Sequence, residues 1–110
     1  MSLPKSIKIL SGRWRVISGK DWDQANELCG LTKQDEKKIY ISTNYPEWAQ
    51  AATLLHEIIH AIEDELDFEL KEKQVRLLEI GLVQVLRENP KFVKELIKMP
   101  PEEPEDADVK

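Results

Sequence analysis

Apolar residues in the second half of the chain recur every three or four positions, which is the spacing of one helix face. The first such stretch begins after Pro46 and predicts a helix to about Leu66. Its apolar positions include Ala49, Ala52, Leu55, Ile59 and Ile62. Residues 67–70 form a connection, and a second helix is predicted from about Lys71 to Arg87. Its predicted core-facing residues are Val75, Leu78, Leu82, Val83 and Leu86. Asn89-Pro90 ends this helix, and residues 91–99 can form a short third helix.

The first half of the chain shows strand patterns instead. Residues 13–18 have strand composition between two glycines, residues 7–10 can form an earlier short strand, and residues 38–42 alternate polar and apolar. Residues 21–30 predict a turn or a short helix that Gly30 ends, and the polar residues 32–38 lead into the next strand. Ser42, Thr43 and Asn44 offer capping oxygens to the first long helix, with Pro46 in its first turn.

These elements predict one α+β domain over residues 1–99. A small antiparallel or mixed sheet packs on the first long helix, and the second helix and a short C-terminal helix follow. The 110 residues suffice for one domain, and 41% hydrophobic with 34% charged residues is typical of a globular protein. No apolar run approaches the roughly 20 residues of a membrane span, and the N-terminus lacks a signal peptide's apolar core.

Charge and cysteine content narrow the function classes. The formal charge is −5, and residues 101–110 hold five acidic side chains against Lys110, so the rest carries about −1. Without a basic face, nucleic acid is not an expected partner. Cys29 is the single cysteine, which excludes an internal disulfide and favours a cytoplasmic location. We expect Cys29 to pack near the turn at Gly30.

Candidate chemistry lies in the first long helix, at His56-Glu57-Ile58-Ile59-His60. This H-E-x-x-H spacing places both imidazoles on one helix face, where they can bind Zn²⁺ with Glu57 beside the metal as a base. The flanking positions are uncharged, and the chain's only two histidines both fall here. The alternative is an ordinary helix whose two histidines bind no metal.

A catalytic zinc usually has three protein ligands, so a carboxylate or Cys29 must complete the set. Glu72 is the preferred candidate because a tight connection can fold the start of the second helix back over the first. Glu79 lies on the same face two turns further and is the second choice. Three other acids are less favoured: Glu63, Asp64 and Glu69. The first two sit on or just after the motif helix and point elsewhere.

Strands, an H-E-x-x-H helix and then a helix with a glutamate make residues 13–98 resemble the gluzincin metallopeptidases. The small size is most similar to the minigluzincins, which are minimal gluzincin domains. The resemblance implies a zinc-dependent hydrolase of peptide or protein substrates, with Glu57 as general base and His56, His60 and Glu72 as ligands. Arg76 stands where many gluzincins have an acid that braces a zinc-bound histidine.

Other roles follow from residue chemistry. Tyr40, Tyr45 or Arg87 can donate to the oxyanion, and residues 38–42, as a sheet edge near the site, can hold an extended substrate. The acidic residues 100–110 are either a solvated tail or an inhibitory segment that offers a carboxylate to the zinc. Two other functions remain open: a non-catalytic, zinc-containing regulatory or interaction module, and a helical interaction protein without metal. Glu57 favours the enzyme, because a structural zinc needs no base.

Overall fold

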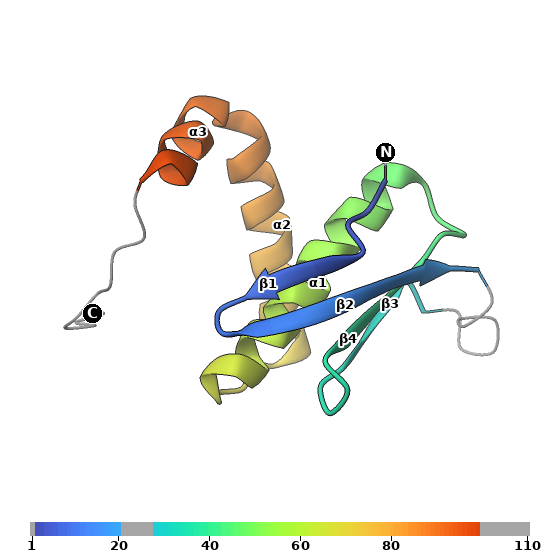
Figure 1. Cartoon of the computed structure of the whole chain (residues 1–110). Coiled ribbons are helices and arrows are strands. Elements are labelled where there is room, and N and C mark those ends of the chain that lie inside the picture. Colours follow the sequence, from blue (N-terminus) through green and yellow to red (C-terminus); the bar gives the residue numbers. More distant parts are fainter. Residues whose placement is uncertain (1, 21–27, 100–110) are drawn as a thin grey trace.

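A four-stranded mixed sheet and three helices make up the described part of the chain, an α+β fold as the sequence predicts (Figure 1). The computed structural model describes residues 2–20 and 28–99. The elements, in chain order, are β1 (Ser6–Ile9), β2 (Gly12–Gly19), β3 (Gly30–Lys33), β4 (Lys38–Ser42), α1 (Glu47–Leu66), α2 (Glu72–Glu88) and α3 (Pro90–Lys98). The spatial strand order is β1-β2-β4-β3, with β2 and β4 parallel and the outer pairs antiparallel.

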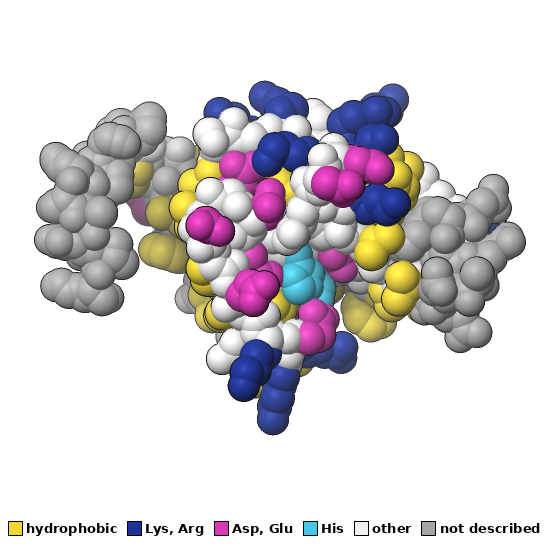
Figure 2. All heavy atoms as spheres, turned by 90° about the horizontal axis from the view of Figure 1, so that it is seen from below, with side chains coloured by type: hydrophobic (Ala, Val, Ile, Leu, Met, Phe, Trp, Pro, Cys, Tyr) yellow, Lys and Arg dark blue, Asp and Glu magenta, His cyan; other side chains and the backbone are white. Residues whose placement is uncertain are grey.

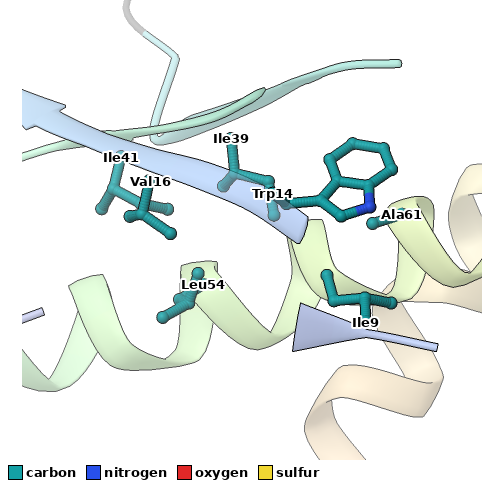
Figure 3. Close-up of a cluster of buried hydrophobic side chains, with 7 residues drawn as sticks. All are labelled: Ile9, Trp14, Val16, Ile39, Ile41, Leu54 and Ala61. Carbon is teal, nitrogen blue, oxygen red and sulfur yellow. The ribbon is translucent and has the colours of Figure 1, made fainter. Parts of the chain in front are cut away.

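The hydrophobic core lies between the sheet and α1. Along β2, Trp14 and Val16 are buried while Arg13 and Arg15 are exposed, so the alternation in the sequence sets which face meets the helix. Figure 3 shows the buried cluster that β1, β2 and β4 form with α1. Its members are Ile9, Trp14, Val16, Ile39, Ile41, Leu54 and Ala61. The core therefore joins β1, β2, β4 and α1 into one body.

A hydrogen-bonded cluster around Glu65 fixes the C-terminal end of α1 to the sheet. The Trp14 indole N–H and the Lys37 ammonium each donate to Glu65 Oε2 at 2.8 Å. Lys37 also lies 5.0 Å from the centre of the Trp14 ring. Three side chains from β2, the β3–β4 turn and α1 therefore hold one another in place.

The position of the strand at residues 38–42 differs from the expectation. The strand is present as β4, but it pairs with β2 on one side and β3 on the other, so it is not an edge. The edge beside Glu57 is β3, where the sequence indicated a turn and a polar stretch. Four residues with polar Thr32 and Lys33 are too few to show a clear period of two.

Two local expectations were also wrong. Pro46 is itself the N-cap of α1 without a side-chain cap, and the Ser42 hydroxyl instead accepts a hydrogen bond from the Asn44 N–H, at 3.1 Å. Cys29 is exposed rather than packed. The predicted turn or short helix falls largely on residues 21–27, and the predicted tail on residues 100–110; both lie outside the described residues.

Helices α2 and α3 form an arm (residues 72–98) that rises away from the sheet (Figure 1). Within the described part of the chain, Val75 is the only buried residue of the arm. Leu78, Leu82 and Leu86, expected in a core, are 38–44% exposed. The helix boundaries agree with the prediction to within one residue. Helix α2 packs on α1 mainly through the N-terminal half of α2, which contains Val75 (Figure 1). No helix in the described ranges is long and apolar enough to cross a membrane.

Candidate metal centre

Three side chains from two helices converge at the junction of α1 and α2. His56 and His60 lie one turn apart on α1, with ring centroids 5.1 Å apart. Glu72, the first residue of α2, reaches both: Oε2 lies 2.8 Å from His56 Nε2, and Oε1 lies 3.1 Å from His60 Nε2. The chain reverses between Leu66 and Glu72, with Asp67 in the left-handed conformation (φ 58°) that ends α1. This reversal brings Glu72 over the histidine pair.

The three side chains form a donor set that could hold a metal ion. One ligand atom from each of His56, His60 and Glu72 lies within 4.8 Å of the others. Two ligands of a tetrahedral Zn²⁺ at about 2.0–2.1 Å are roughly 3.3 Å apart. The contacts at 2.8 and 3.1 Å, which two different oxygens of Glu72 make, would open by a few tenths of an ångström, and ligand atoms separated by up to 4.8 Å would draw together. Two imidazoles and a carboxylate are also the ligand types of catalytic zinc sites. These three residues therefore form a possible metal site.

The second ring nitrogen of each histidine faces another carboxylate. His56 Nδ1 lies 3.0 Å from Glu79 Oε1, and His60 Nδ1 lies 2.7 Å from Glu63 Oε1. A carboxylate on Nδ1 fixes that nitrogen as the donor and leaves Nε2 free to bind a metal. Glu79, the second choice for third ligand, is therefore placed to brace His56. It occupies the role that the resemblance assigned to the position of Arg76.

Glu63 was expected to point elsewhere, but it links His60 to the α1–α2 connection. The residue is buried, and its Oε2 accepts a 2.5 Å hydrogen bond from the Leu70 N–H. The Glu63 carboxylate thus orients His60 and also holds the α1–α2 connection, which leads directly into Glu72. The i,i+3 spacing from His60 could have indicated this contact, because residues three apart on a helix are neighbours.

Glu57 is buried beneath the histidines, with 7% of its surface exposed. The Thr32 hydroxyl of β3 lies 2.6 Å from Glu57 Oε1 and donates to it. Burial raises the pKa of Glu57, while the Thr32 hydrogen bond and the two nearby histidines act in the opposite direction. The carboxylate is therefore held in one orientation beside the possible metal site.

Close packing of β3 on α1 depends on Gly30. A Cβ at this position would lie 2.9 Å from Glu57 Oε2 and 2.5 Å from Thr53 Cγ2. A side chain there would push β3 away from α1 and separate Thr32 from Glu57. The sequence indicated Gly30 only as the end of a turn or short helix and Thr32 only as part of a polar stretch, because their roles arise from a strand that its own pattern did not predict.

A hollow of about 670 Å³ borders His60 and Glu63, and two others, of about 320 and 400 Å³, border His56 and Glu57. The latter two border β3 at Gly30 and also include Glu72 in their lining. Figure 2 shows histidine at the surface of this face, with acidic side chains around it. Of the two hollows beside Gly30, the larger extends along β3 to Gln34, and the smaller reaches Trp48 and Arg76.

The predicted oxyanion donors lie elsewhere. Neither of the two hollows beside Gly30 is lined by Tyr40, Tyr45 or Arg87, whereas Arg76 lines the smaller one.

No model of a known protein family, no curated protein and no solved structure matches the chain. The interpretation of the site therefore rests on its own geometry.

Proposed function

We propose that this protein is a zinc-dependent peptidase of minigluzincin type. His56, His60 and Glu72 would hold the zinc, and Glu57 would act as general base. The observation that carries the proposal is the convergence of two Nε2 atoms and one carboxylate beside a buried, hydrogen-bonded glutamate. A metal site without catalysis has no need of such a glutamate.

The chemistry divides between the metal and the chain. Zinc bound here would act as a Lewis acid toward water and a substrate carbonyl. Glu57 accepts a proton from the attacking water and delivers it to the leaving nitrogen, a double role that suits a carboxylate whose pKa is raised. Thr32 keeps Glu57 Oε1 fixed during this transfer. Glu63 and Glu79 keep the imidazoles oriented.

The edge of β3 is the proposed substrate platform, in place of the strand at residues 38–42. Among the described strands, β3 pairs with β4 alone, so its other side can bind an extended peptide through backbone hydrogen bonds. Both hollows beside Gly30 border this edge, which sets such a peptide across the site. Arg76 provides a positive charge in the smaller hollow, where it can bind a carbonyl or a carboxylate of the substrate.

The first experiment measures zinc per chain in the wild type and in Glu72→Ala, with Glu69→Ala as the matched control. We expect about one zinc in the wild type and in Glu69→Ala, and a sharp loss in Glu72→Ala. Equal zinc in all three would transfer the third-ligand role to Glu79 or a tail acid. A wild type that stays free of zinc after reconstitution would reject the metal site.

The second experiment tests catalysis apart from metal binding. Glu57→Gln should keep its zinc and lose peptidase activity by about 10²–10⁴-fold, the usual contribution of a general base. A wild type that binds zinc but cleaves no peptide, with or without the tail, would instead favour the non-catalytic regulatory module.

Latency through residues 100–110 remains part of the proposal. The segment carries five acidic residues, and carboxylate oxygen is a suitable zinc ligand. Ending the chain after Met99 should then raise peptidase activity. Unchanged activity would show that the tail does not inhibit.

A further inference from the structure

The arm presents an unusually large apolar surface. Ten large hydrophobic residues in and just after α2 and α3 are 38–75% exposed, namely Leu77, Leu78, Ile80, Leu82, Val85, Leu86, Phe92, Leu96, Ile97 and Met99. Monomeric proteins rarely expose contiguous apolar patches above a few hundred Å². Between Leu77 and Leu86, α2 has only Glu79 and Gln84 as polar residues, so this stretch is apolar on nearly every side. A helix of that kind normally lies inside a protein or an interface.

We propose that the arm is a dimerisation element, and that a second copy of this chain covers its apolar surface. Ten half-exposed side chains of this size offer on the order of 1,000 Å² around the two helices. The part of this area on the buried faces would contribute to the roughly 800 Å² that a standard-size interface takes from each partner. Two helical arms packed face to face make a four-helix arrangement, which buries one apolar face of each helix.

Gly81 marks the centre of the contact. It lies in the middle of α2, and a Cβ added there would meet no atom within 4 Å. Glycine disfavours a helix interior relative to alanine, so nothing within the described chain explains its presence. Its neighbours on the same helix face, at i±3 and i±4, include the exposed Leu77, Leu78 and Val85. A small residue among large apolar ones leaves a depression on the helix surface, into which a side chain of a facing helix can pack.

This face is complementary to itself. If two copies of α2 cross antiparallel at Gly81, Leu77 of one lies opposite Val85 of the other, since each is four residues from the centre. The same crossing brings Lys73 of one copy toward Glu88 of the other. Helix α2 carries three acidic and three basic residues, so two copies do not repel one another through net charge. A twofold contact requires this self-complementarity.

Other occupants fit less well. The described body leaves the arm uncovered, and the tail has only Pro100, Pro101, Pro104, Ala107 and Val109 as apolar residues. Its five acidic residues oppose burial against leucines. Those acids also disfavour an anionic lipid surface, and α3 has only nine residues to lie on one. A second arm offers the same apolar area in the same shape.

The test is sedimentation equilibrium of the full chain across the micromolar range, with Leu77→Lys and Leu66→Lys as a matched pair. Both leucines are 57% exposed, but Leu66 ends α1, outside the arm. We expect the wild type and Leu66→Lys to have twice the 12.8 kDa chain mass, and Leu77→Lys to be monomeric. A monomeric wild type, or a Leu77→Lys protein that still dimerises like its control, would overturn the proposal.

Gly81→Ala provides a second test that misfolding cannot imitate. The added methyl meets open space within one chain, so the variant should be at least as helical by circular dichroism as the wild type. The same methyl would occupy the depression at the crossing, and we expect at least a tenfold weaker dimer. An unchanged dissociation constant would exclude a crossing at Gly81.

Discussion

The sheet–α1 body and the α2–α3 arm contrast sharply in how they are held. The seven residues of the core cluster all belong to the body, and Glu65 adds hydrogen bonds between α1 and the sheet. The arm has Val75 as its single buried residue among those described, and it meets the body mainly near the start of α2. The body contains its own stabilising core, whereas the arm, among the described residues, does not.

The candidate metal centre lies at the boundary between the sheet–α1 body and the arm. His56, Glu57 and His60 come from the body, while Glu72 and Glu79 come from the arm. A metal bound here would connect the arm to the body, because binding free energy favours the docked arrangement. Formation of the site and docking of the arm are therefore expected to be one event.

The largest expected effect is on the body. Trp14→Ala should lower the free energy of unfolding by about 3–5 kcal/mol, because it empties the centre of the core and removes a donor to Glu65. Trp48→Ala is the control, since Trp48 is 74% exposed on α1 and should change stability by only about 0.5 kcal/mol. Urea unfolding followed by circular dichroism measures both; similar losses would contradict a core centred on Trp14.

At the candidate metal centre, Glu63→Gln should weaken zinc binding by about 10–100-fold. This is the usual effect of losing a carboxylate that is hydrogen-bonded to a metal-binding histidine, here His60. The change also weakens the bond from the Leu70 N–H that positions the connection to Glu72. Glu69→Gln alters an exposed acid of the same connection and should bind zinc like the wild type. Competition with a zinc-binding dye gives both affinities, and equal values would remove Glu63 from the site.

A smaller effect is expected from Val75→Ala in the arm. The lost methyl groups and the cavity should cost about 2 kcal/mol, mostly as undocking of α2 rather than unfolding of the body. Hydrogen exchange should therefore accelerate in α2 and stay unchanged in β2 and β4, which serve as the internal control. Equal acceleration in both regions would show that the arm and the body unfold together.

The smallest effect concerns pH. Hydrogen bonds from Lys37 and Trp14 lower the pKa of Glu65 below its ordinary value of 4.5. The ionised carboxylate therefore stabilises the fold above pH 4.5, and this contribution is lost as the pH falls through the lowered pKa. Glu65→Gln lacks this component, so its stability deficit relative to the wild type should shrink on acidification. Urea midpoints across pH test this; a deficit that grows toward low pH would reverse the assignment.

Local sequence pattern was enough to find the helices and the histidine pair. The spacing of His56 and His60 and the apolar period around them are properties of one helix, so no distant residue had to be known. Ile39 and Ile41 were likewise indicated by the alternation of residues 38–42, and the strand that carries Trp14 and Val16 was indicated by its composition. The connection at residues 67–70 was short enough to predict that Glu72 folds back over the histidines.

Only the tertiary structure decided which carboxylates serve the histidines and which strand borders them. Glu63 meets His60 within α1, whereas the roles of Glu72 and Glu79 follow from the angle at which α2 crosses α1. That angle also leaves Leu78, Leu82 and Leu86 exposed, although their spacing predicts burial. Strand order placed β3 beside Glu57, with Thr32 as its partner. Periodicity reports which face of an element is apolar, whereas packing between elements determines what that face meets.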